Sequence, residues 1–477
     1  MTMMHSTLSC ARLPRLLGGH WLIPPPDSDC ILTGAGDDSR HLRPGMIFAA
    51  ITGELTDGHR YIEGAVAAGA RAIVVQKEPS QPLLQTMRTA GVACLQVADS
   101  LCAYQQLARL HRLDFPDLPV LAVTGSCGKT STKEMCAAIL AAHFHREALK
   151  TEGSTNNHFG VPRNLLRIDA RTPAAVIELG TNHPGEIAVL TPLVTPTVAL
   201  VSNIGHAHLE FFHDLRGVAS EKGDIFACAP ETATAIYPDE AEGADILCAK
   251  AGTRRCLTFG TTPHANLQVH YAGYAGTAFQ FTLRWNGEVP FSGEQRTVDW
   301  AVGGAHMALN AAAAAAAATA MGCTPDEIAA GLSRCMLPEQ RQELRHQGNN
   351  LWINDAFNAN PDSMRAAIDY FAQNSPAGKK QYLILGDMLE LGPESTALHR
   401  SILTYARRRC PQAQLITIGP IMAQAAESLG EDPARQCVAD TAAARQLLLQ
   451  DPPDNACLLL KSSHGIGVGA LCPPAHQ

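Results

Sequence analysis

The sequence predicts an α/β protein built from three domains, and three observations support this expectation. The 477 residues are enough for about three domains of ordinary size. Apolar segments typical of buried strands alternate with helical patterns through the middle and last parts of the chain. Residues 113–119 hold two prolines and no hydrophobic periodicity, which is typical of a linker. We therefore predict domains over residues 1–116, 117–337 and 338–477.

Each predicted domain has its own pattern of strands and helices. In the first, residues 62–70 have a helical pattern and residues 72–76 a short β pattern. The middle domain is predicted to hold a mostly parallel sheet with helices on both faces, with strands at 120–123, 174–179, 197–202 and 246–250. The third is predicted to be a smaller α/β domain, with strands at 351–354, 381–385, 415–418 and 457–461.

The composition of the chain indicates which kinds of partner and which cellular compartment to expect for the protein. The net charge is −8 and Lys and Arg form no dense block, so we expect neither a nucleic-acid partner nor a membrane surface. The alanine run at 311–318 is too short to insert into a bilayer and predicts a buried or half-buried helix. Residues 1–24 have no long apolar core, so no secretory signal is expected. Fifteen cysteines without a C-x-x-C pair are typical of reduced thiols in a cytoplasmic protein.

A glycine-containing turn between a strand and a helix predicts a phosphate-binding site. The apolar residues 120–123 lead into the turn, and a helical pattern over 132–142 follows it. In such a loop glycines let backbone N–H groups face phosphate oxygens, the lysine neutralises the β- and γ-phosphates, and the following hydroxyl binds Mg²⁺. The alternative is a strand-turn-helix whose lysine is only solvated. The predicted loop residues are Gly125, Ser126, Cys127, Gly128, Lys129, Thr130 and Ser131.

Polar residues also follow the next predicted strands. Glu178 ends an apolar strand, where a cation near the phosphate loop or a neighbouring basic residue would partner its carboxylate. His206 and His208 are two residues apart, so one is expected to point into a cleft and the other away. With Glu210 and His213 they suggest zinc, but no cysteine or helical H-x-x-x-H motif completes a site. From its pattern alone, Lys222 is predicted to be a surface lysine on a helix.

The third domain carries a polar turn, residues 354–364, between a strand end and a helix that begins after Pro361. Its amide and carboxylate side chains suit hydrogen bonding to a nucleotide or a peptide. The alternative is a turn with a helix N-cap.

In chain order, these and further motifs resemble the Mur ligase family, and the resemblance covers nearly the whole chain. The UDP-binding first domain of the family is resembled by residues 38–45, 48–53 and 57–59. Its phosphate loop is resembled by residues 124–134, and its substrate loop by residues 153–162. Further matching motifs lie at 178–180, 182–187, 207–210, 222–226, 358–364 and 385–392 with His399. The last two resemble most the branch of the family that joins D-alanyl-D-alanine to a UDP-muramoyl tripeptide.

The resemblance implies an ATP-dependent amide ligase of peptidoglycan precursor synthesis, with UDP-muramoyl-tripeptide and D-alanyl-D-alanine as substrates. ATP would phosphorylate the tripeptide carboxylate, and the dipeptide amine would then displace phosphate. The implied fold is a small α/β UDP-binding domain, a central phosphate-loop domain and a Rossmann-like C-terminal domain. A monomer is expected, with the third domain closing onto ATP that is bound by the second.

The resemblance also implies roles for individual residues. Two Mg²⁺ sites are expected, one held by Thr130 and Glu178 on the ATP phosphates, the other by His208 and a carbamylated Lys222. Lys129 would bridge the phosphates, and Arg341 would reach the γ-phosphate. The other expected contacts are Asp355 with the ribose, Asn358 with the base, Asn310 with the nucleotide, Ser39 and Arg40 with UDP, and Asn156 and Asn157 with the peptide end.

Several positions depart from the family pattern, mostly on the ATP side. Met307 stands where the family usually has Asn, Gln340 replaces a glycine, and Ser154 replaces an Asn. Ala356 and Phe357 replace a Ser-Tyr pair. His464 replaces an arginine, which would cost a charge-assisted hydrogen bond of roughly 1.5–3 kcal/mol.

Two alternatives remain beside this ligase. One is a divergent family member that joins a different amine, and the other is a nucleotide-binding homologue without ligase activity. The altered segment 461–464 favours the second alternative. The ligase is favoured by an intact set of proposed site residues, because a simple binding protein needs no second metal site. This set is Lys129, Thr130, Glu178, His208 and Lys222.

Overall fold

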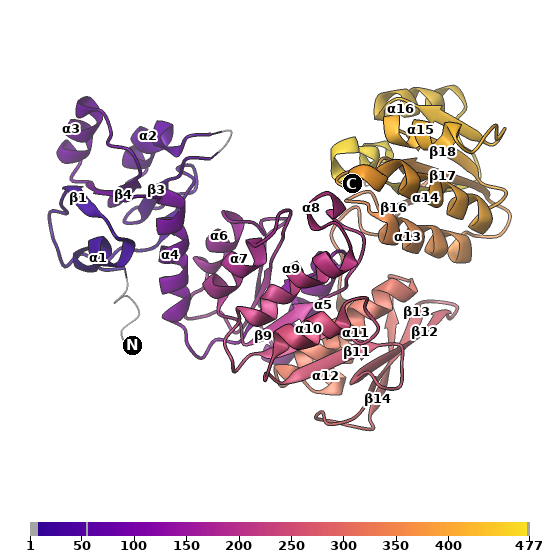
Figure 1. The fold of residues 1–477 in the computed structure, drawn as a ribbon, viewed down its shortest axis with the longest axis horizontal. Coiled ribbons are helices and arrows are strands. Elements are labelled where there is room, and N and C mark those ends of the chain that lie inside the picture. Colours follow the sequence, from indigo (N-terminus) through magenta and orange to yellow (C-terminus); the bar gives the residue numbers. More distant parts are fainter. Residues whose placement is uncertain (1–7, 54–55, 475–477) are drawn as a thin grey trace.

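The structure is a computed structural model that describes residues 8–53 and 56–474. We expected no secretory signal in residues 1–24, and residues 1–7 of that segment lie outside the described residues. Three sheets with surrounding helices follow one another along the chain, and the central domain lies between the other two (Figure 1). The predicted α/β fold of three domains is confirmed. No helix in the described ranges is long and apolar enough to cross a membrane.

The first domain is a five-stranded sheet with the strand order β1-β5-β4-β3-β2. Only β1 runs antiparallel to its neighbour, and the other pairs are parallel. The strands are β1 (His20–Ile23), β2 (Ala35–Gly36), β3 (Ile47–Ala50), β4 (Ala72–Val75) and β5 (Ala93–Gln96), and the helices are α1 (Leu13–Leu17), α2 (Ile62–Ala67), α3 (Gln81–Thr89) and α4 (Ser100–Leu113).

The central domain is a nine-stranded sheet with the order β14-β13-β12-β11-β10-β9-β6-β8-β7. From β7 to β12 all pairs are parallel, as predicted, whereas the β12–β13 and β13–β14 pairs are antiparallel, which the sequence did not reveal. The strands are β6 (Val120–Thr124), β7 (Leu149–Lys150), β8 (Ala175–Glu178), β9 (Val198–Val201), β10 (Thr234–Pro238), β11 (Cys256–Gly260), β12 (Leu267–Tyr274), β13 (Phe279–Trp285) and β14 (Gln295–Trp300).

Helices cover both faces of the central sheet, as predicted. Along β6, Leu121 and Val123 pack into one core while Val120 and Ala122 pack into the other, as the alternation of a strand requires. The helices are α5 (Lys129–Phe144), α6 (Gly160–Leu165), α7 (Glu186–Val194), α8 (Leu209–Phe212), α9 (Leu215–Ala227), α10 (Ala244–Ala251), α11 (Ala305–Ala320) and α12 (Pro325–Arg334).

Two apolar segments of this domain had opposite outcomes. The alanine run forms most of α11, and residues 311–318 are fully buried, so the predicted buried helix is confirmed. Residues 246–250, predicted as a strand, lie instead in α10, so that prediction is wrong. The buried residues of α10 are Leu247 and Ala251, four positions apart, because this helix packs on α9. A five-residue apolar run does not distinguish a strand from a helix.

The third domain is a six-stranded sheet with the order β15-β16-β20-β17-β18-β19, parallel except for the β15–β16 pair. The four strands predicted here are all present. The strands are β15 (Glu343–Gln347), β16 (Asn350–Asn354), β17 (Lys380–Gly386), β18 (Gln414–Ile418), β19 (Arg435–Val438) and β20 (Ala456–Lys461), and the helices are α13 (Pro361–Asn374), α14 (Ser395–Arg409), α15 (Pro420–Glu427) and α16 (Thr441–Gln450).

Side chains from neighbouring domains hold the three bodies together. Asp37 of the first domain accepts hydrogen bonds from the Arg163 guanidinium on α6, with an Nη2–Oδ2 distance of 2.9 Å. Phe279 of β13 is buried against Tyr370 of α13, with 5.9 Å between ring centres. The antiparallel strands of the central sheet therefore reach the third domain.

Close packing of α12 on α5 predicts a sharp cost for one added methyl group. A Cβ at Gly331 would overlap the Ile139 backbone, 2.8 Å from its nitrogen. We expect Gly331→Ala to lower the free energy of unfolding by about 1–3 kcal/mol, measured by urea denaturation followed by circular dichroism.

The matched control for this prediction is Gly64→Ala in the middle of α2. The nearest atom to a Cβ there is Ser39 Oγ at 3.5 Å, and alanine is favoured over glycine in helices by roughly 0.5–1 kcal/mol. The free energy of unfolding of Gly64→Ala should equal that of the parent chain or be slightly higher. Equal stability of the two variants would show that α12 can move away from α5 without cost.

Candidate active site

The phosphate loop joins β6 to α5 and is shaped by its glycines. Gly125 and Gly128 have φ angles of 149° and 76°, which other residues rarely adopt. A Cβ at Gly125 would overlap Ser202 Oγ, and one at Gly128 would lie 3.0 Å from Asn310 Cγ. Because α5 begins at Lys129, three residues earlier than the helical pattern indicated, Lys129 and Thr130 lie at the N-terminus of the helix.

Asn203 supports the loop from the end of β9. Its backbone oxygen accepts the Ser126 N–H at 3.1 Å, and its Oδ1 accepts the Cys127 N–H at 2.7 Å. Ser202 Oγ donates to the Cys127 carbonyl at 2.7 Å. We assigned Asn203 no role from the sequence, although its place directly after a strand was a signal of one.

Glu178 is the buried carboxylate of the site, with only 2% of its surface exposed. Its Oε2 accepts the Thr130 hydroxyl at 3.0 Å, and its Oε1 accepts the Asn156 amide at 2.8 Å. Its own N–H donates to Thr151 Oγ1 at 2.9 Å. The partners are thus a hydroxyl and an amide, rather than the basic residue that the alternative interpretation required.

Arg341 reaches the phosphate loop from the start of the third domain. Its Nη2 donates to Thr130 Oγ1 at 3.1 Å, and its Cζ lies 3.8 Å from the centre of the Phe357 ring, a cation–π contact. Burial lowers the pKa of the guanidinium, and the Glu178 charge opposes that shift. The neighbours Gln340 and Gln342 have φ angles of 61° and 52°, so the backbone on both sides of Arg341 is in the left-handed region.

Two lysines of the central domain are desolvated close to this loop. Lys129 Nζ donates to the Gly125 carbonyl at 2.7 Å, and burial lowers its pKa. Lys222 on α9 is 1% exposed, so its prediction as a surface residue is wrong. The face of α9 that carries it packs against the central sheet. Burial, and then the charge of Lys129, lower the pKa of Lys222 to about 7.

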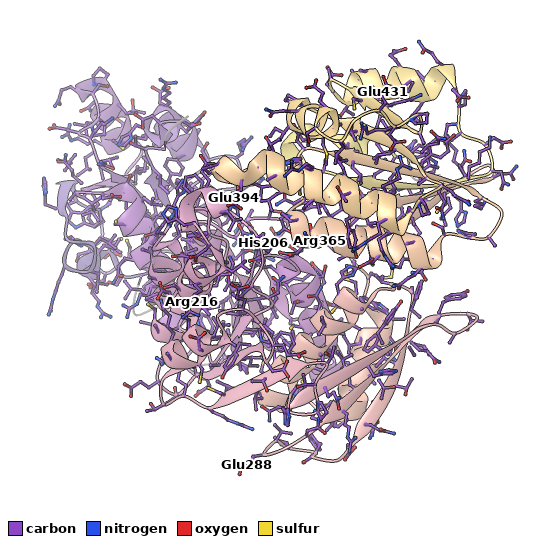
Figure 2. The ribbon with its side chains drawn as sticks, turned by 45° about the vertical axis from the view of Figure 1, so that its right-hand side comes forward. His206, Arg216, Glu288, Arg365, Glu394 and Glu431 are labelled. Carbon is purple, nitrogen blue, oxygen red and sulfur yellow. The ribbon has the colours of Figure 1, made fainter. Side chains whose placement is uncertain are left out.

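Both histidines of the segment after β9 contact the third domain. His206 Nδ1 lies 3.1 Å from Asp362 Oδ2, which also accepts the His206 backbone N–H at 2.7 Å. His208 Nδ1 lies 2.5 Å from Glu390 Oε2, and this contact holds the pKa of Glu390 down. Figure 2 shows His206 at the junction of the two domains, near Arg365 of α13.

The predicted ribose and base contacts lie beside the Arg341 segment. Asp355 Oδ2 is 2.7 Å from Lys461 Nζ, and its Oδ1 accepts the Gln342 N–H at 3.1 Å. Lys461 also donates to the Asn358 carbonyl at 3.0 Å, while Asn358 itself is exposed. His464 lies against Phe357 with 5.6 Å between ring centres, so two departures from the family pattern contact each other.

The residues predicted to hold the UDP and peptide parts have other partners. Arg40 pairs with Asp38 at 2.7 Å, with 81% of its side chain exposed. Ser39 lies beside it on the segment between β2 and β3 of the first domain. Asn157 Oδ1 accepts the N–H groups of Phe159 and Gly160 at the start of α6. Of this group, only Asn156 is joined to the phosphate loop, through Glu178.

The donor atoms at the loop suit a magnesium ion. The Thr130 hydroxyl and the Glu178 carboxylate are oxygen ligands, and Mg²⁺ takes its other ligands from phosphates and water. Within residues 8–53 and 56–474, no three or more His, Cys, Asp or Glu side chains form a group that could hold a metal ion, so the zinc suggestion gains no support.

The site combines a phosphate loop, a buried carboxylate and an arginine from another domain. This combination is typical of multidomain enzymes that use nucleotides. Comparison of the chain with known protein families identifies the family. The Mur ligase middle-domain model matches residues 123–318, the Mur ligase glutamate ligase domain matches residues 340–464, and the Mur ligase family catalytic domain matches residues 32–112. The chain belongs to the Mur ligase family.

Curated relatives share one name, UDP-N-acetylmuramoyl-tripeptide–D-alanyl-D-alanine ligase. The relative from Escherichia coli (strain K12) is 38% identical over 78% of this chain and 78% of its own, and that from Bacillus subtilis (strain 168) is 33% identical over 80% and 78%. Among solved structures, MurF from Acinetobacter baumannii superposes with a TM-score of 0.84 at 28% identity, covering 97% of both chains.

The burial of Lys222 predicts a pH-dependent cost in stability. Its folded pKa of about 7 lies below the unfolded value of 10.5, so as pH falls from 10.5 to 7 only the unfolded state takes up the proton. The penalty is therefore absent above pH 10.5 and complete below pH 7. We expect Lys222→Met to raise the free energy of unfolding at pH 7.5 by on the order of 3 kcal/mol in CO₂-depleted buffer, a gain that shrinks toward pH 10.

Lys380→Met is the control for this measurement, because Lys380 is exposed on β17. Urea unfolding of both variants and the parent chain from pH 6 to 10 gives the comparison. A Lys222→Met gain that stays constant over this pH range would mean that Lys222 is charged in the folded protein.

Proposed function

We propose that this chain is an ATP-dependent ligase that adds D-alanyl-D-alanine to UDP-N-acetylmuramoyl-tripeptide, in the synthesis of peptidoglycan precursors. The name shared by the curated relatives, at 33–38% identity in the two described above, supports the reaction. The structural observation that carries the proposal is the chain of hydrogen bonds from Arg341 of the third domain through Thr130 to Glu178. It places a cation, a hydroxyl and a carboxylate together at the phosphate loop.

The chemistry has two steps. A carboxylate is a poor electrophile, so the terminal carboxylate of the tripeptide attacks the γ-phosphorus of ATP, giving an acyl phosphate and ADP. The amine of D-alanyl-D-alanine then attacks the acyl carbon, phosphate leaves with the electron pair of the C–O bond, and the nitrogen loses a proton. Both reactants of the first step are anionic, so positioning and charge neutralisation must supply most of the rate.

The loop residues provide that neutralisation. Lys129, Arg341 and the N-terminus of α5 converge on the phosphates, and the burial of Thr130 and Glu178 beside them strengthens each interaction. Thr130 and Glu178 would hold Mg²⁺, whose charge offsets that of the phosphates when it is bound. Asp355, Asn358 and Asn310 are the proposed contacts to the rest of the nucleotide.

Lys222 and His208 form the proposed second cation site. A pKa of about 7 leaves a large share of Lys222 as a neutral amine at physiological pH, and only the neutral amine attacks CO₂. The new N–C bond and the loss of one proton give a carbamate, which is an anionic oxygen ligand. This carbamate would also remove the repulsion between Lys222 and Lys129.

The remaining assignments follow the domain order. We assign residues 1–116 to UDP binding through Ser39 and Arg40, residues 117–337 to ATP, and residues 338–477 to the closing ligase domain. Asn156 and Asn157 are assigned to the peptide end of the substrate. The enzyme is proposed to act as a monomer in the cytoplasm, where ATP and nucleotide-linked precursors are available.

Phosphate release tests the proposal directly. Purified chain is incubated with ATP, Mg²⁺, UDP-muramoyl-tripeptide and D-alanyl-D-alanine, and each component is omitted in turn. We expect release only with all four and a UDP-pentapeptide as the product, with at least a hundredfold loss in Arg341→Ala, since removal of one donor to a developing charge costs about that much. ATP binding without release would indicate a homologue without ligase activity, and turnover with another amine a divergent ligase.

The role of Lys222 has its own test. Lys222→Ala should abolish ligation while ATP binding persists, and added bicarbonate should not restore activity, because no amine remains to form a carbamate. Depleting CO₂ should slow the parent enzyme, and bicarbonate should then restore it. Full activity of Lys222→Ala would remove the carbamate from the mechanism.

A further inference from the structure

The Gln342 side chain is a buried amide on the boundary between the central and third domains. It is 4% exposed and begins the segment that leads into β15. Its Nε2 lies 3.2 Å from Nε2 of His306 on α11, and its backbone N–H donates to the Asp355 carboxylate. Gln342 therefore joins the helix behind the phosphate loop to the proposed ribose contact.

One end of this amide has no partner. The Oε1 atom is closed off from solvent and accepts no hydrogen bond in the structure. Burial lowers the pKa of His306 to about 4, so its ring is neutral and its Nε2 can accept the Gln342 amide hydrogen. A buried acceptor left without a donor is destabilising, so a ligand that brings a donor to it gains affinity.

The position of this acceptor relative to the phosphate loop indicates the ligand. Asn310 packs against Gly128, and His306 lies four residues earlier on the same face of α11. Arg341, next to Gln342, reaches Thr130 at the phosphate end. A nucleotide with its phosphates at Gly128 and its ribose at Asp355 would thus direct its base toward His306 and Gln342.

We propose that Gln342 Oε1 accepts a hydrogen bond from the exocyclic amino group of adenine and so selects ATP among purine triphosphates. The inference rests on the proposed use of ATP. Guanine carries a carbonyl oxygen at the same ring position, which can accept but not donate. Because the His306–Gln342 contact crosses the domain boundary, the base enters as the third domain moves, and the Gln342 acceptor gains its donor in that step.

The test compares ATP with purine riboside 5′-triphosphate, which has hydrogen in place of the amino group. Phosphate release from the full-length chain with both other substrates gives KM and kcat for each nucleotide. For the parent chain we expect a KM about tenfold higher for the analogue at similar kcat, because a site built to pair a polar group rejects a ligand that lacks it. Gln342→Met should raise the KM for ATP to that of the analogue and leave kcat within about twofold.

Gln347→Met on the exposed end of β15 is the matched control and should keep the tenfold preference. Thermal unfolding of each variant shows whether it is folded. If Gln342→Met does not fold, the KM values of the parent chain still test the preference for ATP over the analogue. Equal KM values for the two nucleotides in the parent chain, or an ATP preference kept by Gln342→Met, would overturn the inference. Absence of any ATP turnover would instead overturn the proposed function.

Discussion

The Thr130 hydroxyl is the point on which the candidate site depends, because it is shared between two domains. It donates to Glu178 at the end of β8 and accepts from Arg341 of the third domain. A hydroxyl has one hydrogen and two lone pairs, so this arrangement leaves one lone pair for a metal or a water molecule. The glycines of the loop, the start of α5 at Lys129 and the end of β8 all serve to bring these three groups together.

Burial of positive charge is the main electrostatic constraint on the site. Lys129, Lys222 and Arg341 all lose solvation, and the pKa of each is lowered as a result. Glu178 offsets part of that cost for Lys129 and Arg341, and an anionic ligand would offset more. The chain has a net charge of −8, yet it gathers these three basic side chains near the proposed phosphate site.

Contacts across the boundary between the central and third domains are mostly polar. His206 meets Asp362, His208 meets Glu390, and the Cys127 thiol of the phosphate loop accepts the Asn360 amide at 3.4 Å. Such contacts exchange readily with water and substrate, whereas the Phe279–Tyr370 packing is apolar and does not. Polar contacts therefore surround the site where substrates must enter, and apolar packing lies beside it.

The sequence alone determined the features that depend on neighbouring residues. The strand, glycine turn and helix of the phosphate loop were predicted, as were Glu178 at a strand end and the buried alanine helix, because periodicity and turn chemistry are local. Tertiary structure decided the rest. Lys222 looked like a surface lysine until α9 was placed on the sheet, and α10 became a helix because it packs on α9. The pairing of Lys461 with Asp355 joins residues 106 positions apart, and only the folded sheet brings such residues together.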